Sequence, residues 1–428
     1  MHRICRNRAA LELFFLLAIA LIFRVWVTVS IIGFNQIGLT SDDSEFESIG
    51  WTLAQVGRYA AHPDSPSTAH RSPMLPLLLA GIYSLVGHQR AVAQSVLIFI
   101  STLTVFITLL LGKEVGGRRV GVLAGLWVAL DPFAWIFAGI FYGETLFTFA
   151  FVLIILFLLR VIKCPKRRDL VLLAVVLGFC VLTRPNGLLV ALGSITLLPL
   201  AGGGRFKDWL YRAMSVSAIV VFLMTPWIGR NLLIFNRFIP TTSQTGEVLL
   251  GFYNEMCLEY RCNEWISISM LSNYMDYRLP DDEMARNDFQ VKLALSSIRA
   301  HPIEWLALLP GKVVRFWTHD VLLPNTSYHS NPPLNFLVFQ KAYYLFILLL
   351  SLAGLFILYF TRHRQVFIIL ASFLAIFSLM VLVLWGDARL RMPLHPLLAV
   401  AGAYALTTTY DNVFGRAKVQ AYWGNKRQ

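Results

Sequence analysis

Long apolar segments recur along the whole chain and restrict it to one class of protein. A helix of about 20 apolar residues crosses the roughly 30 Å hydrocarbon core of a bilayer. We find about ten candidate segments, near residues 9–32, 91–111, 120–140, 144–162, 169–183, 187–201, 212–229, 336–360, 366–385 and 393–410. Only 14% of the 428 residues are charged and 57% are hydrophobic, far from the balance of a soluble domain. The pattern predicts an all-α, polytopic membrane protein.

Basic residues are distributed unevenly among the segments that join these helices. With a cytoplasmic N-terminus, the inner connections hold 19 Lys and Arg against 4 Asp and Glu. The positive-inside rule therefore predicts that both termini are cytoplasmic and that the largest loop is outside. The net charge of +13 is explained by this topology, so we expect the lipid bilayer as a partner and no nucleic acid. The first segment is too long for a signal peptide and is expected to remain as an anchor, where Arg24 either reaches the surface or faces the bundle interior.

A polar loop after the first segment begins with two adjacent acids, Asp42 and Asp43, that repel each other and resist burial. Apolar residues then recur at helical spacing up to Gly57, which predicts an amphipathic helix on the membrane interface with Ser41 or Asp42 as its N-cap. This stripe consists of Phe46, Ile49, Leu53 and Val56. The apolar run 73–86 contains two prolines and predicts a second interfacial helix, preceded by the cation Arg71.

Further charges are expected on the same outer face. Glu144 opens a predicted helix, where it is either a helix N-terminal charge or a functional acid at the mouth of the bundle. Arg184 lies in a tight turn and is either solvated or functional, and Arg230 follows an interfacial Trp as a membrane anchor would. Arg389 and Arg391 lie beside Asp387 at head-group level, a position that suits an anionic ligand.

The chain divides into three predicted regions. Residues 1–230 form an N-terminal transmembrane module with a catalytic loop at 33–90, residues 231–335 an extracytoplasmic helical subdomain, and residues 336–428 the last spans and a cytoplasmic tail. Helices are predicted at 284–298 and 303–316 in the subdomain. Cys257 and Cys262 lie close enough to form a disulfide and are equally compatible with two free thiols. No metal or nucleotide motif is present, so no metal site and no cofactor are expected.

The succession of motifs resembles the GT-C glycosyltransferases of the family 39 type, which include protein mannosyltransferases (dolichyl-phosphate-mannose-protein mannosyltransferase-like enzymes) and aminoarabinose transferases. The resemblance extends from about residue 1 to 410. It is carried by D-D-x-x-F, R-x-P-x-x-P, G-E-T, T-R-P-N-G, P-W-x-x-R-N, H-P-x-x-W with a following Lys, and R-x-R-x-P-x-x-P. It implies the GT-C fold and transfer of a sugar from a polyprenyl-phosphate donor to an extracytoplasmic lipid, glycan or protein of the cell envelope, with inversion at the anomeric carbon.

The resemblance also implies roles for individual residues. Asp42 is the expected general base, with a raised pKa, while Asp43 stays charged and orients the site, and Glu144 positions the acceptor or raises the pKa of the base. The donor phosphate is expected on Arg71, Arg230, Arg389 and Arg391. Further substrate contacts are expected from Arg184, His70 and Lys312.

Two departures from the family pattern bear on these expectations. His70-Arg71-Ser72-Pro73 stands where aminoarabinose transferases resemble E-K-P-P, which leaves the sugar and the acceptor open. The large insert that protein mannosyltransferases carry in the late loop is missing, which favours a bacterial-type enzyme in the inner or plasma membrane, with its active site on the extracytoplasmic face.

The main alternative is a transporter or flippase of a lipid-linked or small anionic solute. Such a protein is expected to carry its charges near the bilayer midplane and to show repeated, broken helices. Here the charges gather at one face and no repeat is visible. A non-catalytic scaffold does not explain acids that face arginines.

Overall fold

The computed structural model describes residues 2–35, 41–201, 206–262, 265–318, 334–361, 363–384 and 386–425. Within these ranges the secondary structure is helical, and the one β-type pairing is an isolated antiparallel bridge between Ala60 and Ser67. The predicted all-α fold is confirmed. Residues 319–333, which we assigned to the large outer loop, lie outside the described residues.

In the part of the chain that the structure describes, six helices are long and apolar enough to cross a membrane. They are α1 (His2–Val27) with its continuation η1 (Thr28–Ile32), α4 (Arg90–Gly116), α7 (Gly143–Lys163), α10 (Phe206–Phe235), α16 (Leu334–Phe360) and α17 (Arg364–Val383). A seventh span arises if α5 (Arg118–Ala129) and α6 (Pro132–Ala138), bent by 56° relative to each other, are counted together. The bend falls at Asp131-Pro132, where the Asp131 carboxylate accepts a hydrogen bond from the Phe133 N–H at 3.0 Å and caps α6.

Three further helices in the described residues account for the rest of the predicted spans. These are α8 (Arg167–Thr183), α9 (Gly187–Leu197) with η2 (Leu198–Ala201), and α18 (His395–Asn425), which follows the 3₁₀ turn η3 (Ala388–Leu394). Each of the apolar segments expected from the sequence is therefore helical within the described residues, and the chain is a multi-pass membrane protein. Six or seven of these described helices have both the length and the hydropathy of a membrane span, whereas α8 and α9 have only 17 and 11 residues.

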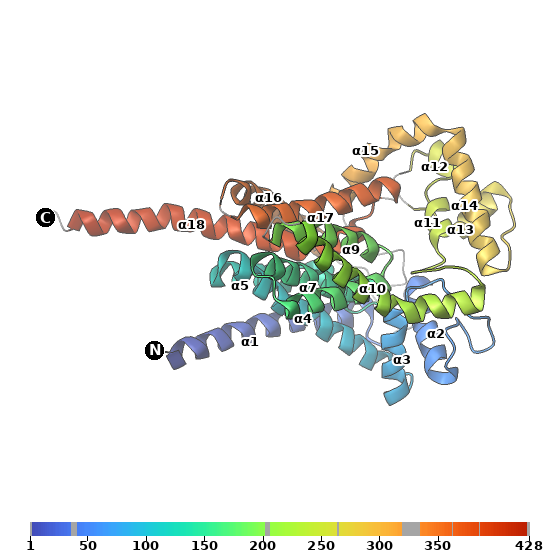
Figure 1. The fold of residues 1–428 in the computed structure, drawn as a ribbon, viewed down its shortest axis with the longest axis horizontal. Coiled ribbons are helices and arrows are strands. Elements are labelled where there is room, and N and C mark those ends of the chain that lie inside the picture. The colour runs from blue at the N-terminus through green and yellow to red at the C-terminus, as the bar shows by residue number, and fades with distance from the viewer. Residues whose placement is uncertain are drawn as a thin grey trace.

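The long helices run side by side and carry a cap of short helices at one end. Figure 1 shows the start of α1 and the end of α18 at one end of the bundle, so the two ends of the chain lie on the same side, and it shows α2 (Ser41–Val56) and α14 (Glu283–Ala300) at the other end. Helices approach closely where both partners are small: a Cβ on Gly112 of α4 would lie 2.8 Å from the Cα of Gly121 in α5. Arg24 faces the interior, where it is buried and donates to Ser101 Oγ at 2.7 Å and to the Ala20 carbonyl at 3.0 Å.

The first loop contains the two expected short helices, α2 (Ser41–Val56) and α3 (Met74–Val86). Phe46 of α2 is buried in a cluster with Leu75, Leu79 and Tyr83 of α3. Gly57 ends α2 with a φ of 68°, a backbone conformation that glycine adopts without strain. We expected Ser41 or Asp42 as its N-cap. The helix begins at Ser41, and Asp42 and Asp43 both lie inside its first turn, so Asp42 is not the cap.

The large loop folds over the same end as α2 and α3. It contains α11 (Thr245–Leu250), α12 (Glu255–Glu259), α13 (Ile268–Met275), α14 (Glu283–Ala300) and α15 (Pro302–Thr318), so both helices predicted there are confirmed. Its own apolar core includes Leu250, Phe252, Leu271 and Trp305. Cys257 and Cys262 are not joined by a disulfide in the structure.

Candidate active site

Asp42 lies between two arginines that come from distant parts of the chain. Arg71, just before α3, donates to Asp42 Oδ1 at 2.7 Å, and Arg389 of η3 approaches Oδ2 at 3.3 Å. Residues separated by more than 300 positions therefore meet at the first turn of α2. The structure brings together the acid and two of the cations that the sequence singled out.

Glu144 extends this cluster toward the bundle. It is buried at the start of α7, and its Oε1 pairs with the guanidinium groups of both Arg389 and Arg184. Arg389 also lies over the Tyr142 ring, with its Cζ 4.1 Å from the ring centroid. Because Arg389 stands between the two carboxylates, Glu144 is placed to orient this arginine and does not act on Asp42 as a like charge.

His70 closes the cluster on the side of the large loop. Its Nδ1 pairs with Glu45 and its Nε2 lies 2.6 Å from Glu247 of α11. Burial lowers the pKa of His70, but the hydrogen bonds to Glu247 and Glu45 outweigh burial and raise it to about 9. Arg71 Nε also donates to Glu45 at 2.7 Å. The loop between α2 and α3 is thus tied to the large loop through a protonated imidazole.

Asp43 belongs to a different network. It is fully buried and pairs with Arg90 at 2.6 Å, while its Oδ1 accepts a hydrogen bond from the Phe141 N–H at 2.7 Å. Arg90 pairs with Glu47 as well and covers the Phe141 ring. Successive residues of a helix point about 100° apart, so neighbouring acids reach different partners. Asp43 ties α2 to α4 and to the turn before α7.

The two acids have opposite pKa shifts. Burial raises the pKa of Asp42, but the charges of Arg71 and Arg389 outweigh burial and hold it well below its usual range. Burial raises the pKa of Asp43, and the opposing effect of Arg90 does not cancel it. We expected the raised pKa at Asp42, and this expectation is wrong, because that carboxylate has two cationic partners.

Three other predicted cations make their contacts elsewhere. Arg230 lies within α10 and donates to the carbonyls of Thr68 at 2.7 Å and Tyr59 at 3.1 Å, so it supports the backbone of the loop. Arg391 is fully buried, donates to the Phe316 carbonyl and lies over the Tyr344 ring. Because alternate residues of η3 point in different directions, the expectation that Arg389 and Arg391 act together is not met by their geometry.

Lys312 of α15 is also buried, and its contacts lie outside the cluster around Asp42, where we expected it to bind substrate. Its Nζ donates to Tyr253 Oη at 3.1 Å and to the carbonyls of Leu382 and Leu384 at 3.1 and 2.7 Å. Burial lowers the pKa of Lys312 to about 7. It joins the cap to the end of α17.

Several site residues were missed by the sequence interpretation. Arg90, Glu45 and Glu47 were not singled out, although Glu45 follows Asp42 by three positions and Glu47 follows Asp43 by four. On a helix these spacings place each acid of the pair beside a second acid on its own face, a signal for two separate networks. In the described part of the chain, no group of three or more His, Cys, Asp or Glu side chains is placed to hold a metal ion.

A bundle of spanning helices with interfacial helices and an acid–arginine cluster at one end has the fold of the membrane GT-C glycosyltransferases. The family model described as dolichyl-phosphate-mannose-protein mannosyltransferase matches residues 67–228, a stretch that holds Arg71, Glu144 and Arg184. The resemblance predicted from the sequence is therefore confirmed for this part of the chain. No curated protein matches the sequence.

Solved structures of an archaeal oligosaccharyltransferase share the fold of this chain at low sequence identity. The oligosaccharyltransferase of Archaeoglobus fulgidus in the apo form has 15% identity and a TM-score of 0.57 over 96% of this chain and 52% of its own. The same enzyme, AglB, in complex with an inhibitory peptide and a dolichol-phosphate has 16% identity and a TM-score of 0.57, with the same coverage. ArnT from Cupriavidus metallidurans bound to undecaprenyl phosphate has 13% identity and a TM-score of 0.43 over 92% of this chain and 77% of its own. The chain spans about half the length of the oligosaccharyltransferase.

Proposed function

We propose that this protein is a membrane glycosyltransferase that moves a sugar from a polyprenyl-phosphate-linked donor to an extracytoplasmic acceptor hydroxyl, with inversion at the anomeric carbon. The observation that carries the proposal is the placement of Arg389 between the carboxylates of Asp42 and Glu144, with Arg71 on the other side of Asp42. A carboxylate flanked by two arginines supplies both functions that such a transfer needs, a proton acceptor and an anion-binding group.

The reaction requires three coordinated changes. The acceptor oxygen forms a bond to the anomeric carbon, the bond from that carbon to the phosphate oxygen breaks with its electron pair, and the hydroxyl proton passes to the Asp42 carboxylate. Arg71 and Arg389 hold the phosphate as its charge increases. Glu144 and Arg184 keep the Arg389 guanidinium in position.

Donor binding would change the basicity of Asp42. With Arg71 and Arg389 as its partners, Asp42 has a pKa well below the usual range, which makes it a weak base. A phosphate bound by the same arginines competes for their hydrogen bonds and offsets their charge, so the pKa of Asp42 rises. The base is then strengthened only when the donor is in place.

The matched relatives support this substrate class. The family model takes its description from dolichyl-phosphate-mannose-dependent enzymes, and the structure of AglB contains a dolichol-phosphate. We assign residues 1–230 to the transmembrane module with the catalytic loop at 33–90, residues 231–335 to the extracytoplasmic cap, and residues 336–428 to the closing spans. In this assignment the cluster faces the outside of a bacterial plasma membrane.

The experiment uses a deletion strain of the native host and complementation with single variants. Mass spectrometry of envelope lipids, glycans and proteins should show loss of one sugar in the deletion strain and its return with the wild-type gene. Asp42→Asn and Arg389→Gln should fail to restore it, whereas Arg237→Gln, at an exposed pair with Asp288 on the cap, should restore it fully. A deletion strain that loses no sugar, or full restoration by both site variants, would overturn the proposal.

A further inference from the structure

Helix α6 is a short, buried helix that lies between the spans α5 and α7. All seven of its residues are buried, and it begins at a sharp bend, since α5 and α6 are bent by 56° relative to each other. A helix of two turns has little stability by itself, so contacts with neighbouring elements decide where it lies. Those contacts join two parts of the candidate site.

The bend before α6 is held by side chains from two other helices. Arg24 of α1 donates to the Val128 carbonyl at 3.3 Å, near the end of α5, where carbonyls lack helical partners. Asp131 caps α6 through one oxygen, and its other oxygen pairs with His395 Nδ1 at 2.8 Å. His395 directly follows η3, the turn that carries Arg389. Asp131 thus connects the start of α6 to the end of η3.

The other end of α6 is connected to the first turn of α7. Thr145 Oγ1 donates to the Phe137 carbonyl at 2.8 Å, and the residue before Thr145 in α7 is Glu144. Arg389 and Glu144, which form an ion pair in the candidate site, therefore stand on elements that α6 joins. With a rise of 1.5 Å for each of its residues, α6 spans about 10 Å between these two connections.

His395 makes this connection through one ring nitrogen. Nδ1 pairs with Asp131, whereas the buried Nε2 has no hydrogen-bond partner among the described residues. The ring packs against Phe133 and Tyr344, at centroid distances of 4.8 and 5.7 Å. A buried nitrogen without a partner lowers stability, a cost that an aliphatic side chain would avoid. The bond at Nδ1 is therefore the polar contribution of this histidine.

The ion pairs of Arg389 cannot hold η3 by themselves during the proposed reaction. A bound phosphate competes for the guanidinium, so the contact of Arg389 with Asp42 weakens when the donor arrives. The bond between Asp131 and His395 lies inside the bundle, where both side chains are buried, and it does not involve the guanidinium. It can hold the turn in both states.

We propose that Asp131 and His395 are positioning residues: by holding the end of η3 against α6, they keep Arg389 where it binds the donor phosphate. This inference rests on the proposed function of the Asp42 cluster. Arg389 contacts the phosphate, and the two positioning residues act through it.

The test compares three replacements of His395 by titration of the purified full chain with undecaprenyl phosphate. Asn places its amide nitrogen near the position of Nδ1, Gln places it near that of Nε2, and Leu has no polar atom. His395→Asn should keep the affinity within about twofold, whereas His395→Gln and His395→Leu should lower it about tenfold. A side chain that only filled space would give the reverse order, because Gln and Leu are closer to His in size than Asn is. The reverse order, or wild-type affinity in all three variants, would overturn the proposal.

A double-variant cycle shows whether His395 acts through Arg389. In protein that carries Arg389→Gln, the further change His395→Leu should lower the affinity no more, because the cation that it positions has been removed. Losses that add in the double variant would contradict the positioning role.

A buried control tests whether any loss near the bend has the same effect. Tyr343→Phe removes a hydrogen bond from α16 to the Trp127 carbonyl in the last turns of α5. It should lower the Tm and leave the affinity for the lipid phosphate unchanged. A loss of affinity as large as that of His395→Leu would show a general effect of packing and overturn the proposal.

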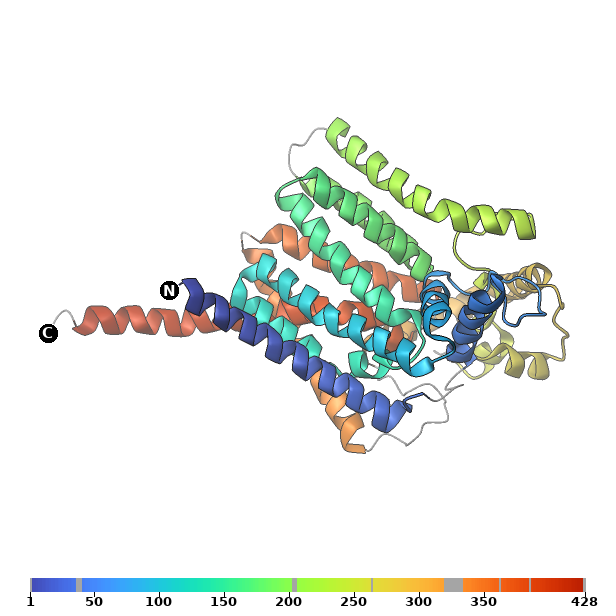
Figure 2. The ribbon, with the colours of Figure 1, turned by 90° about the horizontal axis from the view of Figure 1, so that it is seen from below.

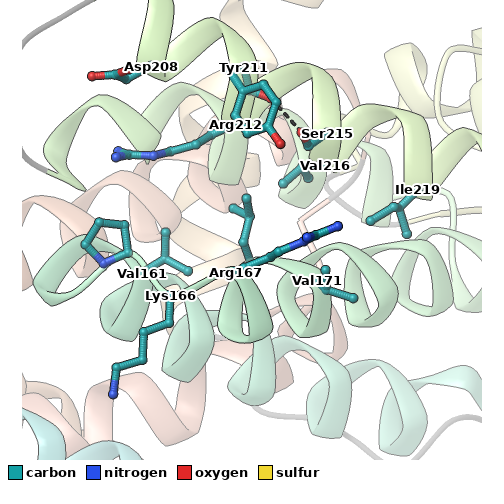
Figure 3. Close-up of a pocket in the computed structure, with 12 residues that line it drawn as sticks. Val161, Lys166, Arg167, Val171, Asp208, Tyr211, Arg212, Ser215, Val216 and Ile219 are labelled. Atoms are coloured by element: carbon teal, nitrogen blue, oxygen red, sulfur yellow. Dashed lines mark hydrogen bonds between the residues drawn. The ribbon is translucent and has the colours of Figure 1, made fainter.

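A charge control is available at the far end of α7, roughly 30 Å from Glu144. A cavity of about 420 Å³ opens there between α7, α8 and α10, and α10 lies at the edge of the bundle (Figure 2). Figure 3 shows that Arg167 and Arg212 point apart in this cavity, so they do not converge on one anion. Arg167→Gln should therefore leave the affinity unchanged.

The wild type separates this inference from the proposed function. Absence of both sugar transfer and lipid phosphate binding in the wild type would overturn the proposed function and the positioning role with it. A wild type that does both, beside His395 variants that match it, would overturn the positioning role alone.

Discussion

Asp42 and Asp43 are neighbours in the chain, but their carboxylates belong to separate ion-pair networks. Asp42 meets Arg71 and Arg389 at the candidate site, and Asp43 is enclosed with Arg90 and the backbone N–H of Phe141. In the proposed reaction Asp42 is the acid that takes part in the chemistry, whereas Asp43 holds α2 against the bundle. This division can be tested residue by residue.

Removing the Asp42 carboxylate should abolish transfer and leave the fold intact. Asp42→Asn keeps the size of the side chain but cannot accept a proton, so kcat should fall by at least about a hundredfold. Asp43→Asn should instead lower the free energy of unfolding by about 1.5 to 3 kcal/mol, because Arg90 keeps only Glu47 as a charged partner. Measurements of sugar transfer and of thermal melting for both purified variants show which acid serves catalysis and which serves stability. An inactive but stable Asp43→Asn beside an active Asp42→Asn would show that the roles are exchanged.

Arg389 and Arg391 should differ in their effects on donor binding. Arg389→Gln removes a cation that contacts Asp42 and Glu144, so affinity for a polyprenyl phosphate should fall about ten- to a hundredfold. Arg391→Gln removes a buried contact with the Phe316 carbonyl and should lower the Tm without changing that affinity. Titration of the lipid phosphate, followed for both variants, separates the two effects. Equal loss of affinity in both would place Arg391 in the site after all.

The stability of the cap should depend on pH through His70. The pKa of His70 is raised from 6.5 to about 9 by its two carboxylate partners, so the protonated form favours the folded state. This contribution is complete below pH 6.5 and is lost as the pH rises through about 9. Melting temperatures of the wild type should therefore decline over this window, and His70→Gln should flatten the decline. A decline of the same size in the variant would assign the effect to another group.

The orientation of the chain in the membrane remains a prediction with a direct test. Ala285 of α14 and Lys207 of α10 are both exposed and lie toward opposite ends of the bundle. In a background without native cysteines, a cysteine at 285 should react with an impermeant reagent from outside intact cells, and one at 207 should not. The reverse pattern would place the Asp42 cluster on the cytoplasmic face.

Apolar length and helix signals in the sequence were sufficient for much of the fold. The segments around α4, α7 and α17 are long and nearly free of charge, so their helices followed from hydropathy alone. The stripe from Phe46 to Val56 and the stop at Gly57 defined α2 to within a residue or two. The bend between α5 and α6 was not foreseen, although Asp131-Pro132 is a recognisable helix break.

The composition of the site was harder to predict than the fold. Asp42, Arg71, Glu144, Arg184 and Arg389 were each singled out and do meet. The sequence could not show that Arg391 points away from Arg389, because a 3₁₀ turn with a proline sets that direction. Arg90 was missed because it lies at the start of an apolar helix, where a cation is typical of a membrane-surface anchor. Its buried partner Asp43 is evident only in the structure.

The charges of the cluster around Asp42 balance one another. Four carboxylates, Asp42, Glu45, Glu144 and Glu247, face four cations, Arg71, Arg184, Arg389 and protonated His70. In the proposed reaction, a donor phosphodiester would bring one negative charge, and transfer would leave a phosphate monoester that can ionise twice while the acceptor proton rests on Asp42. Once that proton passed to water, the site would hold two surplus negative charges in a partly dehydrated space, and their mutual repulsion would favour release of the lipid phosphate. In such an enzyme, release of the lipid phosphate would follow the loss of one proton from Asp42.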